Sequence, residues 1–334
     1  FAQEWALFSL FGSATYAYKS RYSLTGNLRA DASSRFGADN KWGYFPALSL
    51  GWVVSNEDFF TPNNIVNYLK IRASSGRLGN QNISNYAYLT LFSREGNITR
   101  YGNPKLKWET TLQNNLGIDL RMFSNKVELN ADIFKKKTKD ILLGISLPTF
   151  VGNVDATYVN AGEVENTGFE LNLRFKDKLG ADGFYSLGGN LTGINNKVVA
   201  LHENVPRIIG EVTRAEIGQP LDVYYGYRME GIYQNAAEVS THLHGMSNPT
   251  AKAGDIKFAD LNEDGIINDA DRGFIGNPIP KWSYGFFGSL DYKGFDLNIF
   301  FQGVEGVDRY NDGMRIVDFD TRPFNYTTRM LDAW

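Results

Sequence analysis

The residues best suited to chemistry lie in one stretch, DLNEDGIINDADR, which runs from Asp260 to Arg272. Side chains that carry oxygen recur there at nearly every second position, with a glycine in the middle. A calcium loop of the EF-hand type takes oxygen ligands from positions one, three, five, seven, nine and twelve, and it places glycine at position six for a sharp turn. The spacing therefore predicts a calcium (Ca2+) site.

Every ligand position of such a loop is filled when Asp260 is taken as position one. The expected ligands are Asp260, Asn262, Asp264, the backbone carbonyl of Ile266, Asn268 directly or through water, and Asp271. Gly265 falls at position six, and the apolar Ile267 falls at position eight. Position twelve is Asp rather than Glu. The side chain that would make the bidentate contact is therefore shorter, and we expect a lower affinity for calcium.

No helical pattern flanks this loop. Residues 255–258 before it have an extended pattern, and residues 273–280 after it lead into a strand. The sequence predicts an isolated calcium loop rather than a paired EF-hand. The alternative is a turn rich in Asp, Asn and Gly whose side chains cap their own backbone without a metal.

Other reactive side chains are few. The chain has no cysteine, which excludes disulfides, thiolate metal sites and cysteine nucleophiles. Its three histidines are His202, His242 and His244, and the His-x-His pair in a polar segment is a weak metal signal. No nucleophile, base and orienting group form a recognisable local arrangement, so no enzyme is predicted.

Composition indicates a folded protein. The 334 residues are 43% hydrophobic and 21% charged, and the formal net charge of -3 gives no reason to expect a nucleic acid partner. No apolar run reaches the 18 or so residues of a membrane helix. The chain begins at Phe1 without a recognisable signal peptide, so we expect the true N-terminus to be absent.

The dominant periodicity along the chain is two. In residues 111–123, Leu112, Leu116 and Ile118 alternate with polar residues, which places one face in an apolar medium and the other in water. Residues 127–133 continue the alternation after a short turn and complete a hairpin. We count about eleven such strands, many of ten residues or more, so the predicted fold class is all-β.

Connections alternate between short and long. Tight turns are expected at residues 18–22, 124–126, 176–183 and 291–295. Long polar loops are expected at residues 31–43, 79–109, 138–162, 195–220, 234–280 and from 305 onward. This asymmetry is typical of an outer-membrane β-barrel, which must close on itself because lipid cannot pair with free backbone groups. A soluble all-β protein shows the same alternation of residues and remains the alternative.

Five blocks carry a resemblance to a known family. They are residues 21–52, 102–143, 160–173 (NAGEVENTGFELNL), 224–239 (YYGYRMEGIYQNAAEV) and 254–306. In this order and over almost the whole chain, they resemble the SusC/RagA family of TonB-dependent outer-membrane transporters. The resemblance implies a transmembrane antiparallel barrel of about 22 strands, of which roughly half are here.

The resemblance also implies parts beyond residues 1–334. A signal peptide, a TonB box, a plug domain and the last barrel strands are expected to be absent from this chain. Family members import oligosaccharides or peptides across the bacterial outer membrane, beneath a SusD-like surface lipoprotein. TonB, ExbB and ExbD supply the energy through the missing N-terminal part, and the barrel contacts outer-membrane lipid and lipopolysaccharide.

Two alternative functions are kept. One is a TonB-dependent receptor for an iron or cobalamin chelate, which the quoted blocks disfavour. The other is a soluble or secreted calcium-stabilised β-sandwich that serves in adhesion or carbohydrate binding.

Two further groups of residues have two interpretations each. A run of lysines ends one strand: Lys135, Lys136, Lys137 and Lys139. This position favours their interpretation as a solvated strand end over a role in attracting an acidic ligand or lipopolysaccharide phosphate. Five aromatic residues could stack on sugar rings: Trp42, Tyr44, Trp52, Trp108 and Trp282. Those near strand ends are better explained as membrane-interface aromatics.

Overall fold

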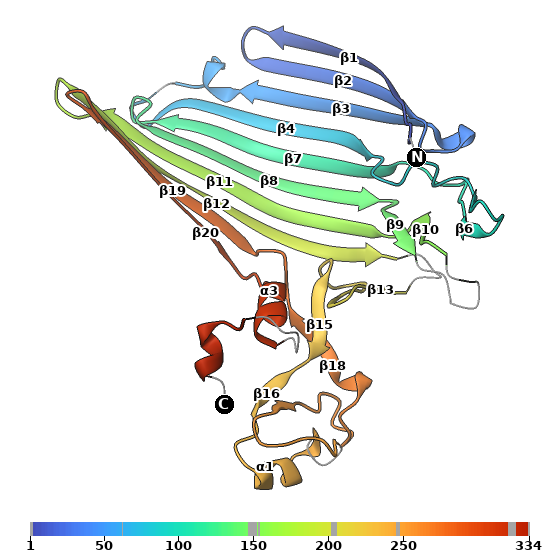
Figure 1. Ribbon diagram of the computed structural model, residues 1–334. Helices are drawn as coiled ribbons and strands as arrows, with labels where there is room; N and C mark the ends of the chain where they lie inside the picture. Colours follow the sequence, from blue (N-terminus) through green and yellow to red (C-terminus); the bar gives the residue numbers. More distant parts are fainter. Residues whose placement is uncertain are drawn as a thin grey trace. The chain divides into compact units, whose positions relative to one another are not determined.

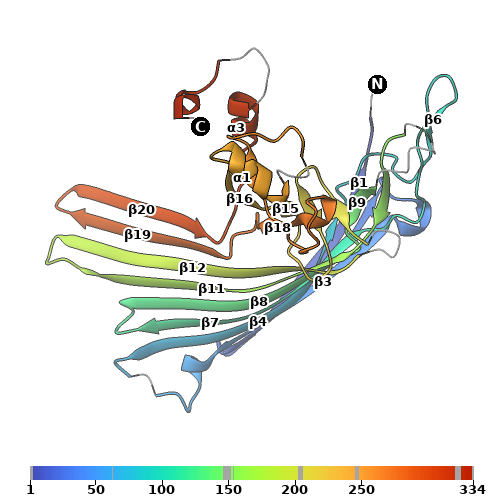
Figure 2. The same ribbon diagram turned by 90° about the horizontal axis from the view of Figure 1, so that it is seen from below.

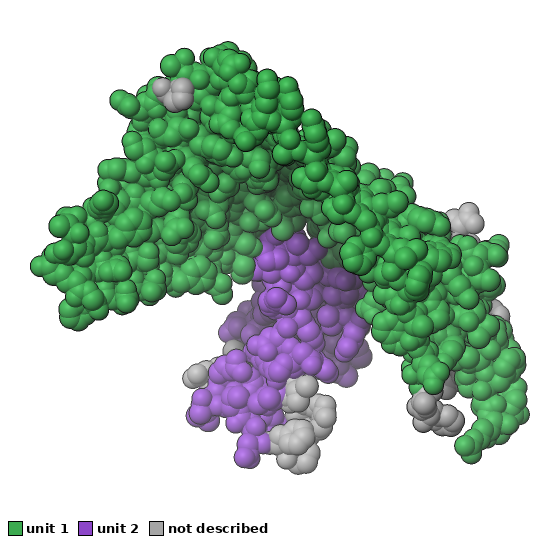
Figure 3. Space-filling model, turned by 90° about the horizontal axis from the view of Figure 1, so that it is seen from above, with its two compact units in different colours: residues 1–207, 216–221, 281–305 green, residues 208–215, 222–280, 306–334 purple. Residues whose placement is uncertain are grey.

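The computed structural model describes residues 3–61, 63–145, 152, 154–201, 206–244, 248–319 and 325–332. The chain divides into two compact units, coloured separately in Figure 3. Unit 1 comprises residues 1–207, 216–221 and 281–305, and unit 2 comprises residues 208–215, 222–280 and 306–334.

Unit 1 is built on one antiparallel sheet of ten strands, which lie side by side in Figures 1 and 2. In sheet order the strands are β1 (Leu7–Tyr18), β2 (Tyr22–Ser33), β3 (Trp42–Val53), β4 (Val66–Asn80), β7 (Glu109–Met122), β8 (Val127–Lys139), β11 (Glu163–Lys178), β12 (Gly183–Ala200), β19 (Trp282–Tyr292) and β20 (Phe295–Glu305). The sheet is open, with β1 and β20 at its edges. The predicted all-β class and partial barrel sheet are confirmed, with ten strands where about eleven were expected.

The period of two in the sequence becomes two chemically different faces of this sheet. Leu116 lies opposite Ile133 and Ile118 lies opposite Ala131 on one face, because the register of β7 and β8 aligns their apolar residues. Side chains next to them in the chain, such as Asn115, point to the other face. Leu116 and Ile133 are 50% and 58% exposed, so the apolar face has no protein packed over it at this point.

Most connections between the strands alternate in length as predicted, and the exception is the connection from β3 to β4, residues 54–65, on the short-turn side. The turn between β19 and β20 is formed by Lys293 and Gly294, whose φ angles of 52° and 84° are those of a two-residue hairpin turn. Short turns also join β1 to β2, β7 to β8 and β11 to β12. Two of the long connections contain small hairpins, formed by β5 (Leu91–Phe92) with β6 (Ile98–Arg100) and β9 (Leu142–Ile145) with β10 (Thr157–Asn160).

The buried core of unit 1 lies at the ends of the strands that carry the long connections. Its members are Phe36, Phe45, Ile83, Ala87, Leu106 and Trp108. Phe45 and Trp108 meet edge to face with ring centroids 5.4 Å apart. The loop segments are therefore held to the sheet by their own small hydrophobic cluster.

Unit 2 corrects two of the predicted loops. Residues 195–220 and 234–280 were expected to be long polar loops, but β12 extends to Ala200 and the remainder contains several short strands and helical turns. Unit 2 contains a four-stranded sheet of β13 (Ile208–Ile209), β14 (Thr213–Ala215), β15 (Val223–Tyr227) and β18 (Arg272–Gly276), and a hairpin of β16 (Met229–Ile232) with β17 (Ile256–Phe258). Strands this short carry too few residues for a periodic pattern, which is why the sequence did not reveal them.

Helical segments are short. Those within the described ranges are η1 (Ala38–Asn40), η2 (Val54–Asn56), α1 (Ala236–Thr241), η4 (Asp269–Asp271), α3 (Asp312–Met314), η5 (Arg315–Phe319) and η6 (Thr328–Asp332). In the described part of the chain, no helix has the length and apolar character needed to cross a membrane.

An ion-pair network ties three strands together on the polar face. Arg72 of β4 donates to both carboxylate oxygens of Asp119 at 2.9–3.1 Å and to Asp132 at 2.9 Å. Gly117 lies between Arg72 and Asp132 in the sheet. A Cβ at this glycine would come within 2.2 Å of Asp132 Oδ1 and 2.9 Å of Arg72 Nη2, so a larger residue there would displace these side-chain ends.

We expect the Gly117→Ala variant to destabilise the complete receptor by about 1–3 kcal/mol, because overpacking displaces the Arg72 network. The measurement is the midpoint temperature of unfolding in detergent. Gly12→Ala is the matched control, because a Cβ at Gly12 meets no atom within 4 Å. Equal midpoints for the two variants would contradict the steric role assigned to Gly117.

Candidate functional site

The polar face of unit 1 carries a hollow of about 320 Å³. Its lining includes Ser23, Thr25, Ser49, Lys70, Arg72, Ser74, Asn115 and Asp132. Asn115 donates to Ser74 Oγ at 3.0 Å, so these groups already form hydrogen bonds with one another. Hydroxyl, amide and charged groups of this density suit hydrogen bonding to a hydrated solute or a polar protein surface.

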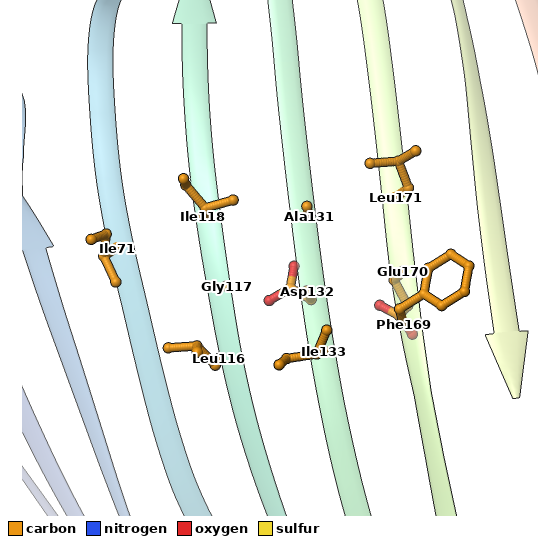
Figure 4. Close-up of a pocket in the computed structure, with 10 residues that line it drawn as sticks. All are labelled: Ile71, Leu116, Gly117, Ile118, Ala131, Asp132, Ile133, Phe169, Glu170 and Leu171. Atoms are coloured by element: carbon orange, nitrogen blue, oxygen red, sulfur yellow. The ribbon is translucent and has the colours of Figure 1, made fainter. Parts of the chain in front are cut away.

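The apolar face carries a larger hollow of about 570 Å³ over β4, β7, β8 and β11 (Figure 4). Its apolar lining residues are Ile71, Leu116, Ile118, Ala131, Ile133, Phe169 and Leu171. The small side chain of Ala131 leaves space between bulkier neighbours on adjacent strands. Such a surface suits hydrocarbon and offers no group for catalysis.

Aromatic residues mark both ends of the apolar face. Near the long connections, Trp42 stacks on Tyr44 with ring centroids 6.4 Å apart. Near the short turns, Trp52 lies opposite Tyr22. Between Trp42 and Trp52 of β3, ten residue steps of about 3.3 Å span about 33 Å, which a strand tilt of about 40° reduces to about 25 Å. This is the height of the apolar band of outer-membrane barrels.

The aromatic residues singled out from the sequence therefore separate into two groups. Trp42, Tyr44, Trp52 and Trp282 occupy register positions on the apolar face. Trp108 is only 6% exposed, and its indole N–H donates to the carbonyl of Lys41 at 3.0 Å. Stacking of Trp108 on a sugar ring is excluded because the residue belongs to the buried core.

The acidic loop of unit 2 has the backbone that its spacing predicts. Gly265 at position six has a φ of 82°, in the left-handed region that glycine adopts without strain. Its N–H donates to Asp260 Oδ2 at 2.8 Å, which joins positions one and six. The extended segment β17 precedes the loop and β18 follows the single turn η4 at its end, so no α-helix flanks the loop among the described residues.

Asp271 closes this loop from the inside. Its side chain is fully buried, and its two carboxylate oxygens accept from the N–H groups of Asn268 at 2.7 Å and Leu261 at 3.0 Å. The bond from Asn268 is the main cause that lowers the pKa of Asp271, against the opposing effect of burial. The carboxylate is therefore ionised at neutral pH.

Asp260 leaves one oxygen unsatisfied. Its Oδ1 atom is buried and has no hydrogen-bond partner among the described residues. The Asp260 carboxyl also contributes to the lowered pKa of Asp271, so the two acidic groups lie close together. A buried carboxylate oxygen that has no partner and lies near a second carboxyl group is a position that a bound cation would satisfy.

The remaining candidate ligands are exposed and bonded to the loop itself. Asn262 accepts from the N–H of Asp264 at 3.1 Å, and Asp264 accepts from the N–H of Ile266 at 2.9 Å. Asn268 caps the turn at residues 269–271 by accepting from the N–H of Ala270. Across the described residues, no three His, Asp or Glu side chains lie close enough together to hold a metal ion by themselves. The predicted loop relies instead on two Asn amides and a backbone carbonyl besides its three Asp residues.

The histidines have structural roles where the structure describes them. His242 Nδ1 lies 2.8 Å from the hydroxyl of Tyr233, and its Nε2 lies 3.0 Å from Glu230. His244 packs edge to face on Phe258 with ring centroids 4.9 Å apart. His202 lies outside the described residues.

The polar network around Arg72 was not predicted from the sequence. Arg72, Asp119 and Asp132 each occur in the polar phase of a strand, but they are far apart in the chain. Only the register of three strands brings them together, and no local pattern encodes that register.

A family model described as "TonB dependent receptor-like, beta-barrel" matches residues 2–333. The chain belongs to this family, which confirms the SusC/RagA resemblance at family level. Members of the family are receptors and transporters rather than enzymes, in agreement with the prediction of no catalysis.

Named relatives support the same assignment. TonB-dependent receptor P3 of Formosa agariphila is 34% identical over the whole of this chain and 35% of its own length. TonB-dependent receptor SusC of Bacteroides thetaiotaomicron is 28% identical over 89% of this chain and 31% of its own length. This chain therefore spans about a third of the curated relatives that it matches.

A solved structure shows the same fold. The RagAB peptide transporter superposes with a TM-score of 0.77 at 23% identity, over 91% of this chain and 33% of the matched chain. The open sheet of unit 1 accordingly corresponds to part of a larger barrel.

Proposed function

We propose that this chain forms part of the barrel wall of a TonB-dependent importer in the bacterial outer membrane. The observation that carries the proposal is the family match over residues 2–333, on a sheet whose two faces suit lipid and water. Strands of 11–18 residues are at least as long as the 9–11 residues that a tilted membrane strand needs. The aromatic residues at both ends of the apolar face support the same placement.

The proposed mechanism is passage of a hydrated solute along the polar face. Ser, Thr and Asn side chains of the polar hollow exchange hydrogen bonds with water and solute, while the Arg72 ion pairs keep the strands in register. Energy comes from TonB, ExbB and ExbD through the N-terminal part of the complete receptor. A SusD-like lipoprotein is the proposed surface partner, on the basis of the SusC/RagA resemblance.

The proposed substrates are oligosaccharides or peptides. The structure described as a peptide transporter supports peptides, and the SusC/RagA resemblance supports both classes over an iron or cobalamin chelate. The soluble β-sandwich alternative is disfavoured, because the ten strands form one sheet whose apolar side chains are exposed.

An uptake assay with labelled oligosaccharides and labelled peptides tests the function. It compares the parent strain with a strain lacking the complete receptor. We expect uptake of one of the two classes to fall about tenfold or more in the deletion strain, and equally in a strain lacking TonB. A SusD-like lipoprotein should co-purify with the receptor. Uptake of both classes that survives deletion of the receptor would refute the proposal.

We also propose that the loop from Asp260 to Asp271 binds calcium and thereby stiffens unit 2. The complete ligand spacing supports this, as do the left-handed Gly265 and the buried free Oδ1 of Asp260. A calcium ion near Asp260 and Asp271 would neutralise both carboxylates, and Asp264 would supply a third charge. The ligands would be those expected from the sequence, with the Ile266 carbonyl and Asn268 completing the set.

Hydrogen exchange of residues 260–271 in the complete receptor, with and without calcium, measures this binding at its location. We expect protection to rise with a Kd of about 10⁻⁴–10⁻³ M, as for extracellular calcium modules. The Asp260→Ala/Asp264→Ala variant should lose the response, because it removes two ligands. Asp269→Asn is the control, since Asp269 is outside the predicted ligand set and its side chain is 82% exposed. A calcium response that persists in the double variant would exclude the site.

A further inference from the structure

The lysine run at the end of β8 is divided between the two faces of the sheet. Lys135, Lys137 and Lys139 follow Ile133 at intervals of two residues, so they share the apolar face. Lys136 points to the polar face, where it lies opposite Gln113. Three cations are thus placed on the face whose central part suits hydrocarbon, at the end of the strand that leads into a long connection.

Neighbouring strands add two more cations to the same face. Arg77 of β4 lies opposite Leu112 of β7, which itself lies opposite Lys137. Lys197 of β12 lies opposite Glu165 of β11. Both cations are exposed. We define the basic cluster as Arg77, Lys135, Lys137, Lys139 and Lys197.

Two carboxylates lie within the basic cluster without neutralising it. Glu163 pairs with Lys137 at 2.7 Å and with Lys139 at 3.4 Å, and Glu165 pairs with Lys135 at 2.9 Å. Five cations against two carboxylates leave three positive charges in excess. The glutamates hold the lysine side chains in place and leave the surface able to attract an anion.

The proposed placement of the barrel in the outer membrane brings the basic cluster to the interface where anionic headgroups occur. Its residues occupy the ends of β4, β8 and β12 that lead into long connections, and long loops of outer-membrane barrels are extracellular. Charged side chains on a lipid-facing surface are costly at the membrane centre and nearly free at the interface. On the same strands, next to the lysines and toward the short turns, lies the apolar hollow of about 570 Å³ at Ile133, Ala131 and Phe169.

We propose that the basic cluster and the apolar hollow together form a binding site for one anionic, phosphate-bearing lipid of the outer leaflet. The phosphate contacts Lys135, Lys137 and their neighbours, and one acyl chain lies in the hollow over Ala131. The positive charge of the cluster complements a phosphate, and the adjacent apolar hollow suits an acyl chain. A ligand that fills both must be amphipathic. The site rests on the proposed placement in the outer membrane and is independent of the imported substrate.

Native mass spectrometry of lipid A binding to the complete receptor tests the site. The receptor is held in nanodiscs of zwitterionic phosphatidylcholine. Lys135→Gln/Lys137→Gln should weaken binding about 25-fold, at about fivefold per lysine near an anionic lipid. Lys136→Gln, on the opposite face, should leave binding unchanged. Glu163→Gln should strengthen binding about fivefold, a gain that misfolding cannot produce.

A second pair of variants examines the acyl chain. Ala131→Phe fills the hollow and should weaken binding of lipid A, whereas Ala14→Phe on the same face of the edge strand β1 should not. Inorganic phosphate should not compete at concentrations that match the lipid. Equal binding by the Lys135→Gln/Lys137→Gln and Lys136→Gln variants would overturn the site. Competition by phosphate with no effect of Ala131→Phe would assign the cluster to free phosphate and also overturn it.

Parallel uptake measurements separate this inference from the proposed function. If uptake depends on TonB but lipid A binding is the same in all these variants, only the lipid site is refuted. Loss of the variant effects together with TonB-independent uptake refutes both.

Discussion

Backbone N–H and C=O groups that enter hydrocarbon must find partners within the protein, because lipid offers none. A sheet meets this requirement through its ladder hydrogen bonds, and successive side chains then point to opposite faces. In this chain the register between β7 and β8 aligns Leu116 with Ile133 and leaves Asn115 and Asp132 on the other face. A slip of one residue would exchange the two faces, so the apolar band, the Arg72 network and the basic cluster all depend on this register.

One electrostatic rule explains the placement of charges in unit 1. On the polar face, Arg72 is held by two carboxylates, which suits a pair that water can partly solvate. On the apolar face, charged side chains are found at the strand ends and the central hollow is lined by aliphatic and aromatic groups. The same strands therefore offer a wet path on one side and a lipid contact with a charged margin on the other.

Much of unit 1 could be predicted from the sequence, because alternation and tight-turn chemistry are local signals. The hairpins at residues 124–126 and 291–295 are examples, and Lys293-Gly294 forms the turn that its residues favour. The Arg72 network could not be predicted, since it needs the register of strands distant in sequence. Unit 2 was taken for loops because its strands are too short for periodicity, and Trp108 was misjudged because its burial comes from tertiary packing. The acidic loop was visible because its ligand spacing is contiguous in the chain.

The most direct test of the account is a spin-label scan along β8 in the complete receptor, made free of other thiols and reconstituted in lipid. This chain has no cysteine, so single cysteines at residues 128–135 each report one position. The account predicts a period of two: labels at Leu129, Ala131 and Ile133 are relaxed by oxygen, which partitions into lipid, and labels at Asn130 and Asp132 are relaxed by a water-soluble nickel complex. Uniform accessibility along the strand, or an alternation of the opposite phase, would contradict it.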